Sequence, residues 1–441
     1  MNSAPGAVEI APGVHWVGAL DPHLREFDII LKTANGTSYN AYCVRGAWGV
    51  AVIDTVKESH ADEFFARLEQ VASYDEIRVI VLNHLEPDHS GALPELMRRA
   101  PGARLYISQR AQTMLKGLIR KDGLEYTAVN TGDSVSLGDR HLHFLHTPFL
   151  HWPDTQCTWL KEGGVLFSAD VFGCHFCDPR LFNDRAGDFR FSFEYYYQHI
   201  MRPFREHVLT ALDLIEPLPI RTIAPAHGPI LRDAPMSYVQ RYRQLAEPLL
   251  ANEAADREKT LLVFYISAYG STARMAEAVR DGAEALAGVR VSLYDLQGSE
   301  VAPFIDLIEE ADALVFGSPT INGDAVKPVW DLLSSLASVK VREKLGAAFG
   351  SYGWSGEAVA MIEDRLRGLK LRVPVKGVRA KLIPSEAELA QCWMLGQQLA
   401  QHLTGQVERR VIPMEELVGA ASAATSSFAP SIAAKAAPTH P

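Results

Sequence analysis

Two histidines and two carboxylates stand close together in the stretch Asn83-His84-Leu85-Glu86-Pro87-Asp88-His89. The apolar run directly before it, Ile77-Arg-Val-Ile-Val-Leu82, predicts a buried strand. The polar side chains would then lie on the loop that leaves this strand, and rigid scaffolds commonly carry their functional residues on such loops. His84, Glu86, Asp88 and His89 are therefore candidate metal ligands. The alternative is a polar turn that only happens to contain them.

Three more residues of the metal-binding types occur where strand-like runs give way to loops. His151 begins the motif His151-Trp-Pro-Asp154, Asp170 ends the run 165–170, and His227 follows the run 222–226. Like His84, each of these residues lies where a predicted strand gives way to a loop. The sequence therefore predicts one metal site assembled from several strand ends.

The order of these residues resembles the metallo-β-lactamase fold, with Asp170 as the candidate bridge between two metals. Hydrolases of that fold usually carry His-x-His-x-Asp-His and hold zinc, whereas Glu86 replaces the middle histidine here. A carboxylate is a harder donor than an imidazole, and mixed sets suit iron or manganese that changes oxidation state. Together with the second half of the chain, this substitution makes the protein resemble the flavodiiron proteins, which reduce dioxygen or nitric oxide.

The resemblance implies a ligand set and a neighbouring tyrosine. One iron would take His84, Glu86 and His151, the other would take Asp88, His89 and His227, and Asp170 would bridge them. A tyrosine from the run 195–197 would lie near the irons, and Tyr195 and Tyr196 are the catalytic candidates. The remaining histidines, including His175 and the strand-like trio His141, His143 and His146, carry no such motif and are expected to be structural or solvated.

The second half of the chain alternates strands and helices. Strand-like runs occupy 260–267, 290–295, 313–317 and 347–350, with a helix expected from about residue 271. This alternation predicts a doubly wound α/β sheet. The expected fold class is thus α/β, an N-terminal metallo-β-lactamase-like αββα sandwich followed by a flavodoxin-like doubly wound parallel sheet.

Three loops of the second half indicate a bound flavin. The first resembles the phosphate loop of flavodoxins, where backbone N–H groups surround a phosphate at a helix N-terminus. It lacks the spaced Gly-x-Gly-x-x-Gly of a dinucleotide site, which favours FMN over FAD or NAD. The predicted FMN-binding residues are Ser267, Tyr269, Gly270, Ser271 and Thr272 in the first loop, Ser318, Pro319, Thr320, Ile321, Asn322 and Gly323 in the second, and Ser351, Tyr352, Gly353, Trp354, Ser355 and Gly356 in the third. Tyr352 and Trp354 would cover the flavin ring, with ordinary surface packing as the alternative.

Length and composition favour several globular domains. The 441 residues exceed what one hydrophobic core normally serves, and 47% of them are hydrophobic. We expect a diiron domain over 1–250, an FMN-binding domain over 260–405 and a disordered tail over 413–441, which is rich in Ala, Ser, Thr and Pro. The net charge of −10 makes nucleic acid and anionic membranes poor partners, and without a signal-like start or a long apolar run the expected location is the cytoplasm.

The number and spacing of the cysteines indicate whether the chain has its own electron-donating extension. The chain has 5 cysteines, of which only Cys174 and Cys177 form a C-x-x-C pair, so reduced thiols are expected. This pair is either packing thiols or a redox dithiol. Some flavodiiron proteins carry a rubredoxin extension with two such pairs. Since none is present, an external donor is expected, a rubredoxin-like protein or a flavin reductase.

The resemblance predicts a flavodiiron oxidoreductase that reduces dioxygen to water, nitric oxide to nitrous oxide, or both. A head-to-tail homodimer is expected, in which the FMN of one chain serves the irons of the other, with a tetramer as the larger alternative. One rival is a dinuclear zinc hydrolase with a regulatory flavodoxin domain. Another is a non-catalytic electron carrier or redox sensor.

Overall fold

The computed structural model describes residues 6–27, 31–118, 124–247, 257–299, 301 and 304–406. Contacts within the chain divide it into two compact units near residue 252. The predicted end of the first domain at residue 250 and the predicted tail at 413–441 lie outside the described residues, so these limits stay predictions.

The described residues of the first unit form two large sheets. One has seven strands in the order β1-β2-β7-β8-β9-β10-β11, and the other has five in the order β12-β13-β14-β15-β16. The strands of the first sheet are β1 Val8–Ala11, β2 Val14–Trp16, β7 Tyr42–Gly46, β8 Gly49–Ile53, β9 Ile77–Val81, β10 Arg104–Ser108 and β11 Tyr126–Val129. Those of the second are β12 Ser134–Ser136, β13 His141–His146, β14 Gln156–Leu160, β15 Val165–Ala169 and β16 Thr222–Pro225. Two short pairs join β3 Ala19–Asp21 to β6 Thr37–Tyr39 and β4 Glu26–Phe27 to β5 Leu31–Lys32.

Side chains of both faces of these sheets are buried. Ile53 and Phe167 belong to an apolar cluster between the two sheets. Their neighbours Val52 and Leu166 point the other way and pack with residues of the helices. Sheets covered on both faces produce the continuous apolar runs noted in the sequence.

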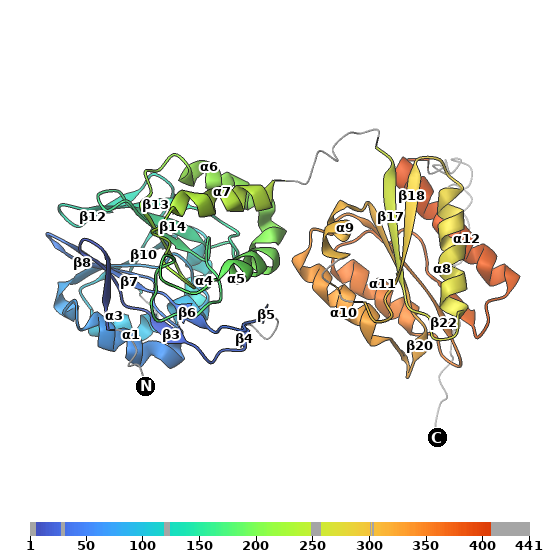
Figure 1. The fold of residues 1–441 in the computed structure, drawn as a ribbon, viewed down its shortest axis with the longest axis horizontal. Coiled ribbons are helices and arrows are strands. Elements are labelled where there is room, and N and C mark those ends of the chain that lie inside the picture. Colours follow the sequence, from blue (N-terminus) through green and yellow to red (C-terminus); the bar gives the residue numbers. More distant parts are fainter. Residues whose placement is uncertain are drawn as a thin grey trace, which may run out of the picture. The chain divides into compact units, whose positions relative to one another are not determined.

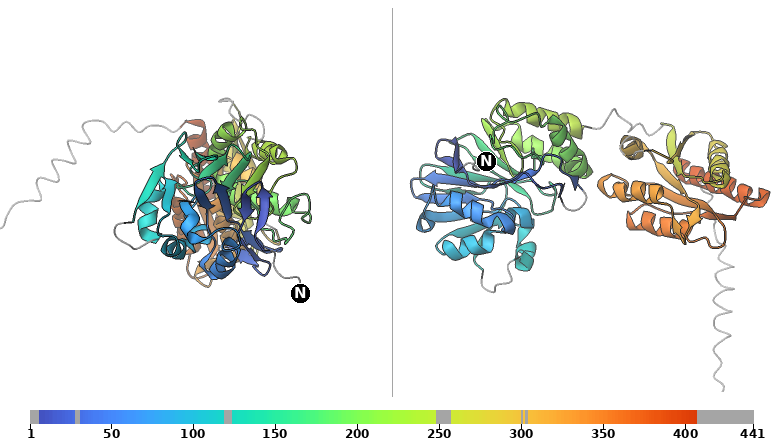
Figure 2. Two further views of the ribbon diagram at one scale, coloured as in Figure 1. Left: turned by 90° about the vertical axis from the view of Figure 1, so that its left-hand side faces the viewer. Right: turned by 60° about the horizontal axis from the view of Figure 1, so that its bottom comes forward.

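Helices form the outer layers of this unit. The described helices are α1 Ala61–Leu68, α2 Pro87–Ser90, α3 Leu93–Arg99, α4 Ala111–Leu118, α5 Arg190–Tyr196, α6 Arg205–Ile215 and α7 Pro235–Ala246. In Figures 1 and 2, α1 and α3 (blue) lie on one side of the sheets, and α6 and α7 (green) lie on the other. The expected αββα sandwich is confirmed.

The second unit is built around a parallel sheet. Its strands are β17 Lys259–Tyr265, β18 Val289–Asp295, β19 Ala313–Gly317, β20 Thr320–Ile321, β21 Asp324–Ala325, β22 Leu345–Tyr352 and β23 Val378–Lys381. The run β18-β17-β19-β22-β23 is parallel throughout and has the strand order of flavodoxin-like sheets. The expected second fold is therefore confirmed as well.

Helices cover both faces of this sheet too. They are α8 Ser271–Glu284, α9 Phe304–Glu310, α10 Lys327–Ser335, α11 Ala358–Gly368 and α12 Glu386–Thr404. Residues of α8 and α12 share an apolar cluster with Leu345, Ala347 and Phe349 of β22. The alternate residues Gly346 and Gly350 face Leu366 and Val359 of α11, so α11 covers the opposite face. No helix in the described part of the chain is long and apolar enough to cross a membrane.

Candidate metal centre and flavin site

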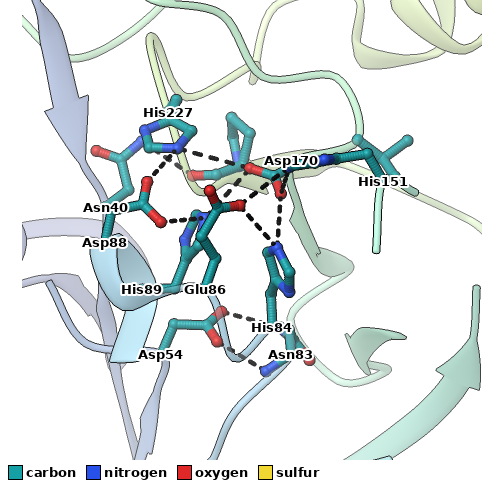
Figure 3. A network of polar contacts seen from close by, with 12 residues as sticks. Asn40, Asp54, Asn83, His84, Glu86, Asp88, His89, His151, Asp170 and His227 are labelled. Atoms are coloured by element: carbon teal, nitrogen blue, oxygen red, sulfur yellow. Dashed lines mark hydrogen bonds and ion pairs between the residues drawn. The ribbon is translucent and has the colours of Figure 1, made fainter. Parts of the chain in front are cut away.

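Strand ends position the candidate metal ligands. Asp170 directly follows β15, His227 lies just beyond β16, and His84 lies just beyond β9. His151 lies on the loop between β13 and β14. Their side chains point toward one another in Figure 3. The sheets thus bring together residues that are far apart in the sequence.

A short helix carries two of the four candidate ligands of the first motif. Glu86 has extended backbone angles and precedes α2, which begins at Pro87. Proline suits the first position of a helix because its ring fixes φ and its missing N–H would have no helical partner there. The side chains of Asp88 and His89 therefore leave from a helical turn, whereas that of Glu86 leaves from the extended residue before it.

The candidate ligands form two groups among the described residues. His84, Glu86, His151 and Asp170 make one group, and Asp88, His89 and His227 make the other, with ligand atoms within 4.8 Å of one another in each. In the first group, Oε2 of Glu86 lies 3.1 Å from Nε2 of His84 and 3.1 Å from Nε2 of His151. In the second, the carboxylate of Asp88 lies 3.3 Å from Nε2 of His89 and 3.1 Å from Nε2 of His227.

Asp170 faces both groups, with a different oxygen toward each. Its Oδ2 lies 3.6 Å from Nε2 of His84 and 3.6 Å from Nε2 of His151. Its Oδ1 lies 3.3 Å from Nε2 of His89 and 3.6 Å from Nε2 of His227. A carboxylate in this position can bind one metal through each oxygen.

The buried carboxylates make this pocket favour positive charge. Burial lowers the pKa of His89, but the charges of Asp88 and Asp170 outweigh it and raise the pKa to about 9. Burial likewise opposes the net shift at Asp170, whose pKa lies well below its usual range because of His89 and His84. A metal cation supplies such charge without protons.

Several ligand-type atoms in the pocket are buried without a hydrogen bond. Among the described residues, they are both carboxylate oxygens of Asp88, Nε2 of His89 and Oδ2 of Asp170. Buried polar groups normally have partners, and a bound ion accounts for such exceptions. The donor set, its burial and these orphaned atoms fit a pair of bound metal ions.

Side chains and a backbone carbonyl outside the ligand set hold it in place. Nδ1 of His227 lies 2.7 Å from the carbonyl oxygen of Ser38, and Nδ1 of His84 lies 3.0 Å from Oδ2 of Asp154. The carboxylate of Asp54 accepts hydrogen bonds from the backbone and side-chain amides of Asn83. Such contacts fix the orientation of metal-binding groups. Apart from the proximity of Asp154 to His151, nothing in the sequence marked these supporting residues.

The three consecutive tyrosines have different surroundings. Tyr196 is buried, and its hydroxyl donates to Oδ1 of Asp170 at 3.0 Å. The ring of Tyr195 instead stacks on Phe191 and lies 4.0 Å from the ring of His199. Tyr197 is buried against Tyr242 and begins a π-helical turn, Tyr197–Met201, that continues α5. Of the two catalytic candidates, Tyr196 is therefore the one beside the candidate ligands.

His175 lies against the pocket, although no sequence motif marks it. Its ring lies 5.0 Å from the rings of His227 and Tyr196, and its Nδ1 is 3.0 Å from the hydroxyl of Thr37. Burial, with the charge of His227, lowers the pKa of His175 well below its usual value, so the ring is neutral. The only sequence signal for this location of His175 was its position shortly after Asp170, on the segment that follows β15.

The three predicted flavin loops meet at one edge of the second sheet. The first begins after β17, the second begins after β19, and the third starts within the end of β22. The hydroxyls of Thr272 and Ser351 lie 2.9 Å apart and join the first loop to the third. Gly270 directly precedes α8 and has φ of 85°, a conformation open to glycine. The first turn of α8 thus directs backbone N–H groups to this edge.

Large aromatic side chains at this edge are exposed. Tyr269 is 98% exposed and Trp354 is 79% exposed. Aromatic side chains that stand this far into solvent beside a helix N-terminus fit a planar ligand with a phosphate group. The described residues of the second unit therefore fit FMN.

The second flavin loop contains a short hairpin. Thr320–Ile321 and Asp324–Ala325 pair as the short antiparallel strands β20 and β21. Asn322 and Gly323 connect them with φ of 55° and 78°. Asn-Gly is favoured in tight hairpin turns that need positive φ at both positions, which explains why the loop folds back here.

Two protein-family models match the chain. The model "ODP family beta lactamase" matches residues 37–228, and the model "Flavodoxin" matches residues 263–396. A type A flavoprotein of Rhodobacter capsulatus is 61% identical over 419 residues, which cover 95% of this chain and 96% of that protein. A nitric oxide reductase of Moorella thermoacetica is 36% identical and covers 90% of this chain and 98% of its own length.

Solved structures agree with these sequence matches. The rubredoxin oxygen:oxidoreductase of Desulfovibrio gigas has a TM-score of 0.64 and 29% identity, covering 91% of this chain and 100% of that one. The flavodiiron protein of Giardia intestinalis has a TM-score of 0.63 and 30% identity, covering 92% of this chain and 98% of that one.

The chain belongs to the type A flavoprotein family, the flavodiiron proteins. It is an oxidoreductase whose cofactors are FMN and a diiron centre, as predicted from the sequence.

Proposed function

We propose that the diiron centre is held by His84, Glu86 and His151 at one position, by Asp88, His89 and His227 at the other, and by Asp170 between them. The placement of Asp170 carries this proposal, since one of its oxygens faces each group of donors. We further propose that FMN binds across the three loops 267–272, 318–323 and 351–356.

The proposed reaction is the reduction of dioxygen to water, of nitric oxide to nitrous oxide, or both. Bound iron and FMN supply the electrons and the open coordination positions. The chain excludes bulk water around the site, where Asp170 is 1% exposed, and Tyr196 offers a hydroxyl donor beside it. The names of the Moorella and Desulfovibrio relatives support both substrates. Membership of this family leaves the zinc hydrolase and the non-catalytic carrier without support.

The decisive experiment measures consumption of each gas by the iron-loaded, FMN-loaded protein after reduction under anaerobic conditions. Dioxygen and nitric oxide electrodes should show rapid uptake that the Asp170→Ala variant lacks. Peroxide should not accumulate. If the loaded protein consumes neither gas, the proposed reaction is wrong, and a peroxide yield equal to the dioxygen consumed would assign the reaction to the flavin alone.

We propose that electrons arrive from an external rubredoxin-like protein or flavin reductase and cross between chains of a head-to-tail dimer. The exposed Tyr269 and Trp354 support a partner surface beside the flavin. A two-fold pairing, the commonest closed symmetry, would let each flavin serve the irons of the other chain.

Mixed dimers test this arrangement. One variant, Asp170→Ala, lacks the irons, and the other, with Gly270 and Thr272 replaced, lacks FMN. Together they should regain activity, because one intact flavin then faces one intact diiron centre. Mixed dimers that form but remain inactive would place electron transfer within one chain.

A further inference from the structure

The motif His151-Trp152-Pro153-Asp154 surrounds His84. His151 lies on the Nε2 side of the His84 ring, since both Nε2 atoms are 3.1 Å from Glu86. Trp152 packs edge-on against the ring with centroids 5.2 Å apart. Asp154 closes the other side, where its Oδ2 lies 3.0 Å from Nδ1. One four-residue segment thus contributes a candidate ligand and a buried carboxylate to the same imidazole.

The position of Asp154 determines which nitrogen of His84 carries a proton. Oδ2 also accepts the backbone N–H of Leu85 at 2.8 Å. A carboxylate has no hydrogen to donate, so an unprotonated Nδ1 would oppose a lone pair to it at 3.0 Å. Once Nε2 binds a metal, the proton of the neutral ring is on Nδ1, where Oδ2 of Asp154 accepts it; the backbone N–H of Leu85 lies 3.0 Å from the same nitrogen.

The other metal position has a neutral partner in the equivalent place. Nδ1 of His227 donates to the carbonyl oxygen of Ser38 at 2.7 Å. In other respects the two positions are matched, because each offers one carboxylate and two imidazoles besides Asp170. The nearby carboxylate of Asp54 bonds to the amides of Asn83, not to an imidazole ring. His84 therefore has a carboxylate in direct contact with its ring, whereas the charge of Asp54 acts on His89 and His84 only through space.

We propose that Asp154 is the positioning residue of His84 and makes the position of His84, Glu86 and His151 the tighter iron site. A carboxylate behind a metal-bound histidine fixes its orientation and raises its basicity. The contacts of this buried carboxylate with His84 and Leu85 are both on Oδ2, and Oδ1 is buried without a hydrogen bond. The inference rests on the ligand assignment of the proposed function.

The test is a ferrous iron titration of the metal-free, FMN-containing full chain against a competing chelator. The unchanged chain should show one tight and one weaker iron. Asp154→Asn keeps the shape and an acceptor but removes the charge, and it should weaken the tight iron about 10-fold, while Asp154→Ala should weaken it up to about 100-fold. The weaker iron should keep its affinity in both variants, and Mössbauer spectra of partly loaded protein should lose the preference for one iron environment.

Two controls distinguish loss of the positioning of His84 from a general loosening of the structure around it. Ser108→Ala removes the hydrogen bond from Oγ of Ser108 to the carbonyl oxygen of Asp154, which is 2.6 Å long, but leaves the carboxylate on His84. It should preserve the tight iron. In a His84→Ala background, Asp154→Asn should have no further effect on iron binding, because the two residues act as one unit. Thermal unfolding of each metal-free variant reports on folding independently.

Three results would overturn the inference. They are equal affinity of both irons in the unchanged chain, unchanged affinity of the tight iron in both Asp154 variants, and equal weakening of both irons. Failure of the proposed ligand set is a different result, since Asp170→Ala would then keep both irons while the Asp154 titrations could still be read.

Discussion

The hydroxyl of Tyr196 donates a hydrogen bond to Oδ1 of Asp170 at 3.0 Å, and both side chains are buried. Burial raises the pKa of Tyr196 well above its usual value, and the charge of Asp170 raises it further. The phenol therefore keeps its proton and can act only as a donor toward this oxygen. Tyr195, its neighbour, has its ring on Phe191 and His199 instead.

Replacing Tyr196 with Phe should lower turnover about 10- to 100-fold with little loss of iron, because it removes a hydrogen bond to the proposed bridge but no ligand. Turnover with each gas and iron content are the measurements. Tyr195→Phe is the matched substitution and should have a much smaller effect. A larger loss in Tyr195→Phe than in Tyr196→Phe would reverse the assignment of the two tyrosines.

Replacing Asp170 with Ala should remove most of the iron while FMN remains bound. The side chain offers one oxygen to each group of donors, so both positions lose a ligand and the remaining carboxylates are too few to hold the metals. Iron and flavin content after purification report the result. Asp184→Ala, which breaks only the ion pair with Arg232, is the control. Retention of both irons by the Asp170 variant would show that the ligand set is wrong.

Replacing Thr272 with Val should weaken FMN binding about 10-fold, the effect of losing one hydrogen bond. The hydroxyls of Thr272 and Ser351 join two of the flavin loops across 2.9 Å. Flavin fluorescence during titration of the flavin-free protein measures the affinity. Thr404→Val removes a helix-surface hydroxyl bonded to the carbonyl of Ala400 and should leave the affinity unchanged. Equal affinities in the two variants would exclude this link from the flavin site.

The cysteines should react slowly with thiol reagents at pH 8. Burial raises the pKa of Cys177 to about 11, with Asp21 and Asp178 adding to the effect, and burial also raises the pKa of Cys174. A thiol with this pKa is about 0.1% thiolate at pH 8, so the rate should increase as the pH rises toward 11. Denatured protein should react at once. Rapid disulfide formation between Cys174 and Cys177 in the folded protein would instead support a redox dithiol.

The strands that lead to the candidate ligands could be predicted from the sequence. His84 and Asp170 are polar residues directly after apolar runs, and the strands that precede them are β9 and β15 as expected. The support behind the ligands could not be predicted in this way. Ser38 contributes a backbone carbonyl, which any residue type could provide, and His175 reaches the site only through the packing of its loop. Which of the consecutive tyrosines faces Asp170 depends on the helical turn at Tyr196, and sequence spacing does not fix that rotation.

Replacing Gly396 with Ala should destabilise the second unit by about 3 kcal/mol, at the upper end for overpacking, because backbone atoms are in the way. A Cβ there would lie 1.9 Å from the carbonyl oxygen of Val279, where α12 crosses α8. Urea unfolding followed by flavin fluorescence measures the change. Gly368→Ala is the matched control, since a Cβ at this residue of α11 meets nothing within 4 Å. Alanine has the higher helix propensity, so this control should be neutral or stabilise by up to about 1 kcal/mol. Equal stability of the two variants would show that α8 and α12 are not packed this closely in solution.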